Sequence, residues 1–421
     1  MVDGFSMGAG AAAKAVAEIA ASRMYFSKKT VEDIDVKGKI VLVRVDFNVP
    51  LVAGQVADDS RIKAALPTIE YLRKQQAKTI LCSHLGRPKG IVDPAFSLKP
   101  VAGRLSELLG GSVRFMDKTV GTEVRDAAKW LKSGDVMLLE NLRFNVGEAE
   151  NDPTFARELA DLAEVYVNDA FGAAHRQHAS TVGVTEYLPS VAGLLLEKEV
   201  SVLKKLIEAP SRPFMACLGG NKISDKIGVI TRFLDMVDGI VAGGGMCFTF
   251  LKAKGYDVGN SIVEENQVEL AKEIINKARD NEVALYLPID IVAATEITPD
   301  ADYKVVSAKA IPKGWKGLDI GPGTIEIFGQ ALESAKTIFW NGPMGVFEIP
   351  QFSHGTKAVA QAIVDATRHG SLSIVGGGDS LAALKTSHLE DKVSFASTGG
   401  GASLKILEGT PLPGVEALEN R

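Results

Sequence analysis

Ten short apolar runs alternate with amphipathic stretches from residue 38 onward, and this alternation constrains the fold more than any other feature of the sequence. The runs are rich in β-branched residues and apolar throughout, as strands buried on both faces are. A βαβα order of this kind indicates parallel sheets covered by helices. The expected strands are 40–45, 79–82, 136–139, 165–167, 214–218, 239–242, 284–287, 337–340, 372–375 and 393–396.

The number of strands and the length of the chain predict two lobes. Ten strands exceed one comfortable sheet, and 421 residues leave room for two large α/β domains. Apolar residues recur at helical spacing over 189–210, which predicts a long helix between the lobes. We therefore expect an α/β protein of two Rossmann-like lobes, with parallel sheets covered by helices, joined by this helix and a hinge.

Composition narrows the class of protein. Hydrophobic residues make up 46% and charged residues 24%, which is ordinary globular composition. No stretch approaches the roughly 20 apolar residues of a membrane span, and a net charge of −5 offers no basic surplus for nucleic acid. Cys82, Cys217 and Cys247 form no CxxC pair, so neither a disulfide framework nor a zinc site is indicated. A cytoplasmic protein that acts on small molecules, without membrane or nucleic-acid partners, is expected.

Residues 1–23 differ from the rest of the chain. They are rich in alanine and glycine, and they lack the continuous apolar region of a signal peptide. We interpret them as an extension of unknown role, with Met24 as a possible true start.

Glycine-rich turns follow several apolar runs of the second half. They occupy 217–226, 241–246, 375–380 and 397–403, with a variant at 339–348. Glycines at strand ends let backbone N–H groups approach phosphate, and the following helix adds its N-terminus. Taken singly, each turn also fits a purely steric need for glycine. Because GxxxxGK[ST] and GxGxxG are both missing, a nucleotide site here must differ from the common ones.

Among the charged residues of these turns, two lysines and one aspartate are candidates for the site. Lys222 and Lys226 stand four apart where a helix is expected to begin, so their charges repel each other and oppose the helix dipole. A bound anion would relieve both penalties, whereas the alternative is a solvated face. Asp379 in GGGDS is a candidate Mg²⁺ ligand, an N-cap, or both.

Arginine and histidine gather at strand ends in the first half, which holds 11 of the 16 arginines. The carboxyl ends of parallel strands share one crevice, where such a cluster is costly unless it binds an anion. Each arginine alone could instead form a surface ion pair of little energy. Together they favour a small polyanion as ligand. The residues are Asp46, Asn48, Arg61, His84, Arg87, Arg143, His175, Arg176 and His178.

Eight motifs in fixed order give the chain a resemblance to the phosphoglycerate kinase family. They are RVDFNVP, SHLGRP, LENLRF, NDAFGAAHR, LGGNKISDK, WNGPMGVFE, GGGDS and STGGGAS, and the resemblance runs from about Tyr25 to the C-terminus. It implies a glycolytic phosphotransferase that converts 1,3-bisphosphoglycerate and MgADP to 3-phosphoglycerate and MgATP, by in-line transfer after hinge closure. The family is usually monomeric.

The resemblance also implies roles for individual residues. Those that would hold 3-phosphoglycerate are Asp46, Phe47, Asn48, Arg61, His84, Leu85, Gly86, Arg87, Arg143 and Arg176. Those that would hold the nucleotide are Lys226, Gly317, Asn341, Glu348, Gly377, Gly378, Asp379 and Ser380, with Asp379 on Mg²⁺. Those that would meet the transferred group are Arg61, Lys222, Lys226, Gly399, Gly400 and Gly401.

The implied domain organisation follows the same motifs. Residues 24–188 would form the 3-phosphoglycerate lobe, 189–210 the interdomain helix and 211–398 the nucleotide lobe, with 399–421 returning to the first lobe. Two alternatives stay open at this point. One is a nicotinamide-dependent oxidoreductase on a doubly wound fold, and the other is a two-lobed binding protein without chemistry.

Overall fold

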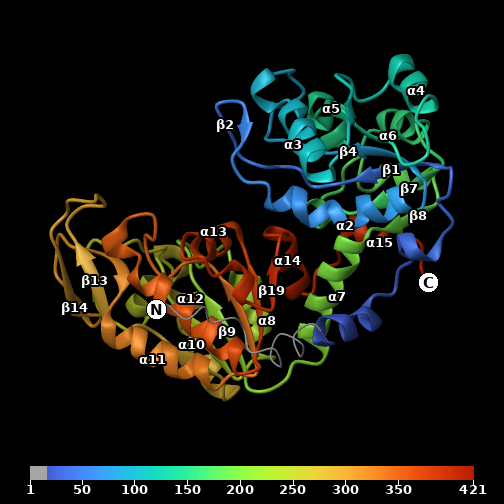
Figure 1. Ribbon diagram of the computed structural model, residues 1–421. Coiled ribbons are helices and arrows are strands. Elements are labelled where there is room, and N and C mark those ends of the chain that lie inside the picture. Colours follow the sequence, from blue (N-terminus) through green and yellow to red (C-terminus); the bar gives the residue numbers. More distant parts are fainter. Residues whose placement is uncertain (1–16) are drawn as a thin grey trace, which may run out of the picture. The chain divides into compact units, whose positions relative to one another are not determined.

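The computed structural model describes residues 17–421, which form two compact units (Figure 1). The N unit comprises Ser22–Val202 and Thr410–Arg421, and the C unit comprises 17–21 and Leu203–Gly409. Of the extension predicted over 1–23, residues 1–16 lie outside the described residues, and 17–21 are helical.

The N unit is built on one parallel sheet of six strands in the order β5-β6-β4-β1-β7-β8. Because every neighbour in this sheet is parallel, all six carboxyl ends lie along the same edge. The strands are β1 (Ile40–Arg44), β4 (Lys78–Cys82), β5 (Val113–Phe115), β6 (Val136–Leu138), β7 (Val165–Asn168) and β8 (Ser190–Ala192).

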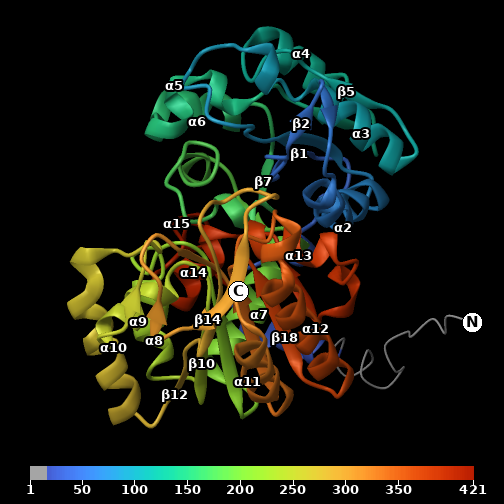
Figure 2. The ribbon, with the colours of Figure 1, turned by 90° about the vertical axis from the view of Figure 1, so that its left-hand side faces the viewer.

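Helices cover both faces of this sheet (Figure 2). On one face α2 (Ser60–Lys74) and α3 (Lys99–Leu109) pack on the strands, and Ile62, Ile69 and Leu105 are among their buried residues. Their spacing puts these side chains on one side of each helix. The other helices are α4 (Thr122–Lys129), α5 (Val146–Glu150), α6 (Pro153–Ala160) and α15 (Pro413–Glu416).

The C unit repeats the plan with a six-stranded parallel sheet, β12-β10-β9-β17-β18-β19. Its strands are β9 (Phe214–Leu218), β10 (Gly239–Ala242), β12 (Ala284–Tyr286), β17 (Thr337–Asn341), β18 (Leu372–Gly376) and β19 (Phe395–Ser397). Its helices are α8 (Ile227–Phe233), α9 (Cys247–Ala253), α10 (Val268–Asp280), α11 (Pro322–Glu333), α12 (His354–Arg368), α13 (Gly378–Thr386) and α14 (Gly401–Leu407).

Apolar side chains of the helices pack on this second sheet. On one face α11, α12 and α13 bury Phe328, Ile363 and Leu384 against the strands. Elsewhere in the unit, Phe233 of α8 makes edge-to-face contacts with the rings of Phe214 and Phe339, with centroids 5.9 and 5.7 Å apart.

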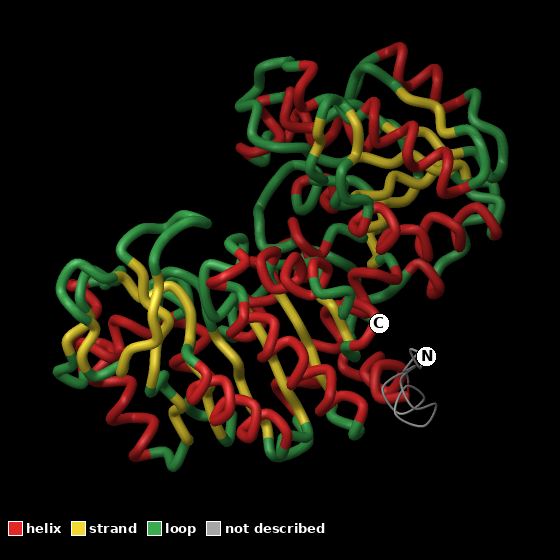
Figure 3. The backbone as a smooth tube through the Cα atoms, turned by 60° about the vertical axis from the view of Figure 1, so that its left-hand side comes forward, coloured by secondary structure: helices red, strands yellow, loops and turns green. Residues whose placement is uncertain are grey.

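All ten predicted strands are present, and all ten belong to the two parallel sheets, so the predicted fold class is confirmed. Strands β5 and β8 were not predicted, because β5 has an exposed arginine between its two apolar residues and β8 lies in the segment interpreted as the start of the long helix. A three-stranded antiparallel sheet, drawn with the other strands in yellow in Figure 3, was also missed. Its middle strand is apolar, but its edge strand is mostly exposed and polar, which hides the pattern. It consists of β13 (Asp290–Ala294), β14 (Tyr303–Ser307) and β16 (Lys316–Ile320). Two short pairs complete the strands: β2 (Leu51–Val52) with β3 (Gln55–Val56), and β11 (Asp257–Val258) with β15 (Ala310–Ile311).

The helix predicted over 189–210 is shorter than expected. Helix α7 (Leu194–Glu208) begins five residues later, because Ser190–Ala192 pair with β7 as strand β8. The change from the N unit to the C unit falls within this helix, after Val202.

The C-terminal segment also divides at a different place. The sequence puts the returning segment at 399–421, whereas the structure keeps residues up to Gly409 in the C unit. Helix α14 packs on α8, and the side chain of Glu408 lies against Gly228. Residues from Thr410 belong to the N unit, where Asn168 Nδ2 donates to the carbonyl oxygen of Gly414 at 2.9 Å.

Within residues 17–421, the structure has no helix with the length and apolar character needed to cross a bilayer.

The aromatic row of the C unit gives a test of the fold. Phe233→Ala removes the central ring and leaves a cavity, so we expect the free energy of unfolding to fall by about 3–5 kcal/mol. Urea denaturation followed by circular dichroism measures this. Tyr303→Ala, at a side chain that is 54% exposed in the same unit, is the control and should cost no more than about 1.5 kcal/mol. Equal effects of the two changes would contradict the packing described.

Candidate active site

Four adjacent strands of the N unit end in loops that carry the predicted substrate residues. In sheet order these strands are β6, β4, β1 and β7, so their loops are neighbours. Arg61 reaches the same group of residues from the first turn of α2. The loop residues are Arg143 after β6, His84, Leu85, Gly86 and Arg87 after β4, Asp46, Phe47 and Asn48 after β1, and Arg176 after β7.

Asp46 organises two of these side chains. Its Oδ2 lies 2.8 Å from Arg61 Nη1, and its Oδ1 lies 3.9 Å from His84 Nδ1. The first contact is a charge-assisted hydrogen bond, whereas the second distance is too long for one. Asp46 therefore orients the Arg61 guanidinium.

The pKa values show that the positive charges converge. Partial burial together with the charges of Arg176, Arg44 and Arg87 lowers the pKa of Arg143 to about 10. Burial and the charges of Arg44 and Arg143 hold the pKa of His84 well below its usual range, so this imidazole is neutral at pH 7. Like charges so close together favour binding of an anion.

Hydrogen bonds between neighbouring loops hold the β4 loop, which follows Cys82, in place. The side chain of Asn141 accepts from Leu85 N at 3.1 Å and donates to Leu85 O at 2.7 Å. Gly86 N donates to Asn48 Oδ1 at 2.9 Å, and Arg143 Nη1 donates to Gly86 O at 2.6 Å. The backbone groups of Leu85 and Gly86 are thus engaged within the protein, and these bonds hold the β4 loop against the neighbouring loops.

Phe47 has a structural place as well. Its side chain is fully buried in the core, and its N–H donates to Ser83 Oγ at 2.8 Å. It anchors the β1 loop between Asp46 and Asn48.

Sequence reasoning missed the charged residues beneath this surface. Arg44, the last residue of β1, is fully buried, and so is Glu148. Ser180 joins them: Arg44 Nε donates to its Oγ at 2.7 Å, and this hydroxyl donates to Glu148 Oε1 at 2.7 Å. A single arginine inside an otherwise apolar strand was the available signal, since such a charge must find a buried partner.

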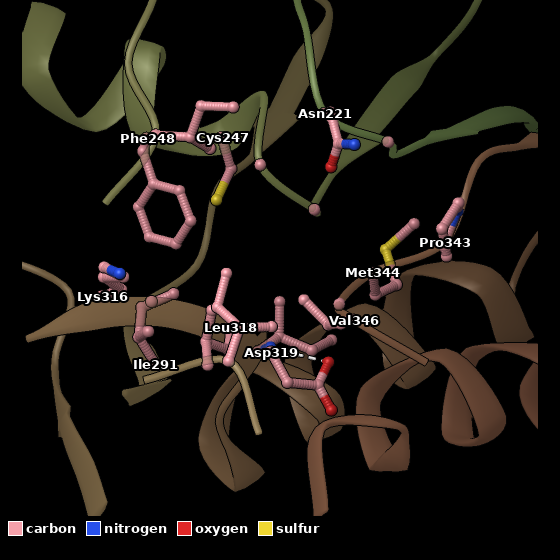
Figure 4. Close-up of a pocket in the computed structure, with 18 of the residues that line it drawn as sticks. Asn221, Cys247, Phe248, Ile291, Lys316, Leu318, Asp319, Pro343, Met344 and Val346 are labelled. Carbon is pink, nitrogen blue, oxygen red and sulfur yellow. Dashed lines mark hydrogen bonds between the residues drawn. The ribbon is translucent and has the colours of Figure 1, made fainter. Parts of the chain in front are cut away.

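The C unit contains a cavity of about 530 Å³ that includes several of the predicted nucleotide residues. Figure 4 shows Phe248, Ile291 and Leu318 at one end of it, and Asn221 and Met344 at the other. Gly317, Glu348 and Asp379 are among its lining residues. A Cβ at Gly317 would lie 2.1 Å from Phe248 Cζ, so glycine here lets the phenyl ring pack on β16. The mixture of apolar walls and a few polar groups is typical of small-molecule sites.

Lys226, Asn341 and Ser380 lie together beside this cavity. Lys226 Nζ donates to Asn341 Oδ1, and Asn341 Nδ2 donates to Gly376 O at 2.8 Å. Ser380 Oγ accepts from Gly342 N at 2.6 Å. Burial lowers the pKa of Lys226 to about 8, although the charges of Asp225 and Asp379 oppose this shift.

The spacing argument for Lys222 and Lys226 is wrong in its geometry. Helix α8 begins at Ile227, so both lysines precede it and do not share a helical face. Lys226 is the N-cap residue and is buried, whereas Lys222 is exposed. The charge of Lys222 helps to lower the pKa of Glu264.

The glycine turns serve two different purposes. After β9, β10 and β17 the loops pack on one another: Gly219 N donates to Asn341 O at 3.0 Å, and Gly244 N donates to Met344 O at 3.0 Å. A Cβ at Gly244, whose φ is +64°, would lie 2.6 Å from Gly220 N. These glycines allow backbones to approach closely, and their N–H groups donate hydrogen bonds within the protein.

The remaining glycine turns open helices. Gly377, with φ +95°, is the N-cap of α13, and Gly378 and Asp379 begin its first turn. Gly400 is the N-cap of α14, between Gly399 and Gly401. A Cβ on Gly378 or Gly400 would meet nothing within 4 Å, so ligand atoms have room there.

Asp319 is a further residue that sequence reasoning missed. It lines the cavity and is buried, and its Oδ2 accepts from Gly355 N at 2.7 Å at the start of α12. Burial raises the pKa of Asp319 to about 7, against the hydrogen bonds from Gly355, Ile320 and His354. It lies inside strand β16, where an isolated aspartate gives no motif.

Comparison with known proteins places the chain in a family. The family model described as phosphoglycerate kinase matches residues 31–410. The phosphoglycerate kinase of Thermosipho africanus is 54% identical over 395 residues, covering 94% of this chain and 98% of that protein. The one of Dictyoglomus turgidum is 55% identical over 398 residues, covering 94% and 100%.

Solved structures that resemble this chain have the same name as these relatives. Phosphoglycerate kinase from Coxiella burnetii superposes with a TM-score of 0.82 at 41% identity, covering 93% of this chain and 98% of that one. The structure from Pyrococcus horikoshii OT3 gives the same TM-score and coverage at 32% identity. The eight motifs and the two parallel sheets agree with these matches, and the chain belongs to the phosphoglycerate kinase family.

Proposed function

We propose that this enzyme carries out its family's reaction with 3-phosphoglycerate bound to the arginine cluster of the N unit and the nucleotide bound in the cavity of the C unit. As a member of the phosphoglycerate kinase family it is a glycolytic phosphotransferase. It interconverts 1,3-bisphosphoglycerate plus ADP with 3-phosphoglycerate plus ATP. The observation that carries the proposal is the convergence of arginines on neighbouring strand ends.

In the N unit, the charges suit a ligand with a carboxylate and a phosphate. Arg61, Arg143 and Arg176 supply guanidinium forks that match such groups in pairs of hydrogen bonds. Arg87 adds an exposed cation, and the lowered pKa of Arg143 supports a site that gains energy when an anion enters. Asp46 and Asn48 hold Arg61 and Gly86 in place.

In the C unit, the apolar end of the cavity suits a base, and the end near Asn221 suits phosphates. Lys226 and Asn341 would contact the phosphate chain, as would the first turn of α13 at Gly377, Gly378 and Ser380, whose N–H groups are available at a helix start. Gly317 and Glu348 would line the nucleoside end.

The carboxylate of Asp379 fits a Mg²⁺ ion that arrives with the nucleotide. This side chain is exposed, and among residues 17–421 it has no hydrogen-bond or ion-pair partner. The described chain contains no cluster of three or more His, Cys, Asp or Glu side chains that could hold a metal. Magnesium needs no such cluster, since one or two carboxylates plus phosphate oxygens and water are usual. Bound there, the ion would neutralise phosphate charge.

The transfer step needs positive charge and alignment from the protein. An oxygen of the ADP β-phosphate bonds to the phosphorus of the acyl phosphate, while the bond from phosphorus to the carboxyl oxygen breaks and the carboxylate leaves. No proton moves, and in the reverse direction a carboxylate attacks without a general base. We assign Arg61, Lys222, Lys226 and the N–H groups of Gly399, Gly400 and Gly401 to the transferred group. The N–H of Gly399 donates to Ser397 Oγ at 3.3 Å and would have to leave this acceptor to contact the phosphoryl group.

Because the two substrates bind to different units, turnover requires a closing motion that excludes water, with a hinge between the units. We also propose that the enzyme acts as a cytoplasmic monomer on small molecules alone, without nucleic acid. Three buried free cysteines and a net charge of −5 support this. The oxidoreductase and the non-catalytic binding protein are not favoured.

An assay of the pure protein tests the function directly. ADP release should require both 3-phosphoglycerate and MgATP. Binding of either compound without turnover above a buffer blank would leave only a binding protein.

Arg61 is expected to act mainly in the transition state. Arg61→Ala should lower kcat by about 10²-fold or more with a modest change in KM, because the guanidinium faces charge that moves during transfer. Arg157→Ala, on the exposed face of α6, is the matched control and should leave both constants unchanged. If the change affects only the KM for the phosphoglycerate substrate and leaves kcat as it was, Arg61 is reduced to a docking residue.

Asp379 is expected to serve the nucleotide alone. Asp379→Asn should raise the KM for MgATP and the Mg²⁺ concentration for half-maximal rate, each by about tenfold, because a charge-assisted contact is lost. The affinity for 3-phosphoglycerate should not change. Asp391→Asn, an exposed carboxylate of the same unit, is the control. If the dependence of the rate on Mg²⁺ concentration is unchanged, Asp379 does not bind the metal.

The lowered pKa of Lys226 predicts that kcat/KM for MgATP depends on pH. Its pKa of about 8 means that the ammonium loses its proton as pH rises through 8, and the neutral amine attracts phosphate less. At saturating 3-phosphoglycerate, kcat/KM for MgATP should therefore be full below pH 7 and fall above pH 8. Lys226→Arg keeps its charge and should move the decline to higher pH. A wild-type profile that stays flat to pH 9.5 would contradict this.

A further inference from the structure

A chain of hydrogen bonds runs from the interior of the N unit to His84, and it begins at Glu148. This carboxylate is fully buried. Its Oε1 accepts from Ser180 Oγ at 2.7 Å and its Oε2 accepts from Ser180 N at 3.0 Å. Burial alone would raise the pKa of Glu148, but His178, Arg44 and Ser180 outweigh burial and lower it. Glu148 is therefore ionised at pH 7 and can only accept hydrogen bonds.

The charge of Glu148 sets the direction of the next link. A hydroxyl has one proton, and Ser180 donates it to Glu148. The lone pairs of Ser180 Oγ are left to accept, and Arg44 Nε donates to them at 2.7 Å. Arg44 Nη1 donates to Val45 O. The buried guanidinium is thus fixed at two of its three nitrogens.

The third nitrogen meets the histidine. Arg44 Nη2 lies 3.0 Å from His84 Nδ1, and both groups are buried. A guanidinium has no acceptor, so Nδ1 must be the acceptor and carries no proton. A proton on Nδ1 would place two donors against each other, and Asp46 Oδ1 at 3.9 Å is too far to compensate.

We infer that Arg44 is a positioning residue that fixes the tautomer of His84, keeping the imidazole neutral with its single proton on Nε2. The substrate site thereby gains an N–H donor of fixed direction without a further positive charge. Ser180 and Glu148 maintain this arrangement by holding Arg44. The lowered pKa of His84 agrees with it, since burial and Arg44 are its leading causes. That the donor serves 3-phosphoglycerate rests on the proposed function.

Nitrogen NMR of the intact protein tests the tautomer. The chain has six histidines, and comparison with His84→Gln assigns the His84 signals. We expect an unprotonated Nδ1 and a protonated Nε2, with no titration of His84 between pH 6 and 8. A proton on Nδ1 in the wild-type protein would overturn the inference, whatever the substrate.

Arg44→Lys tests the cause. Lysine keeps the charge but loses the planar fork that reaches Ser180, Val45 and His84 at once. We expect a mixture of His84 tautomers and a rise of about tenfold in the KM for 3-phosphoglycerate, with the KM for MgATP unchanged. Arg157→Lys, the same change at an exposed position of the N unit, should alter neither. An unchanged tautomer in Arg44→Lys would overturn the inference.

Ser180→Ala is a second test, which applies even if the Arg44→Lys variant fails to fold. It keeps the Arg44 charge and removes only the acceptor of Nε and one donor to Glu148. With a native circular dichroism spectrum it should show the same mixture of tautomers, and a pure Nε2 tautomer would count against the chain of hydrogen bonds. If His84→Gln leaves the KM for 3-phosphoglycerate unchanged, the substrate assignment of His84 fails, while the tautomer result stands on its own.

Discussion

The parallel arrangement of the two main sheets is the constraint on which the candidate sites depend. Parallel strands send all their carboxyl ends to one edge, so residues that are far apart in the sequence become neighbours without further design. In the N unit this brings residues from the ends of β6, β4, β1 and β7 into one cluster. In the C unit it brings together the loops that follow β9, β10, β17 and β18. The side chains gathered at the strand ends differ between the two units, but in both units the parallel sheet brings them together.

Much of this could be predicted from the sequence, because apolar runs mark strands and polar residues after them mark the functional edge. The strand-end positions of Asp46, His84 and Arg143 follow directly from that pattern. The pattern does not show which charged residues are buried. Arg44 and Asp319 lie within strands, and only the folded chain shows that their partners are Ser180 and Gly355. Periodicity cannot reveal a buried charge whose compensation comes from a distant segment.

Helix ends and unit boundaries were harder to predict for a related reason. Pro189 looks like the start of a helix, but Ser190–Ala192 first add a strand to the sheet edge, which is a tertiary interaction. The glycine turns show the same limit. Their sequences look alike, yet the turns after β9 and β10 pack against backbone, whereas Gly378 and Gly400, at the starts of α13 and α14, leave space for ligand atoms. Steric surroundings decide which purpose a glycine serves, and these come from other loops.

The interleaved loops at the cavity have a consequence for how tightly the C unit can bind. Ligand-binding loops are commonly drawn from the least stable parts of a protein and must be ordered when the ligand arrives. Here the loops after β9, β10 and β17 are joined by backbone hydrogen bonds such as those of Gly220 and Gly244. This side of the cavity is therefore preorganised. Little conformational entropy is lost there on binding, so contacts with the nucleotide are available for affinity and for alignment of the phosphates.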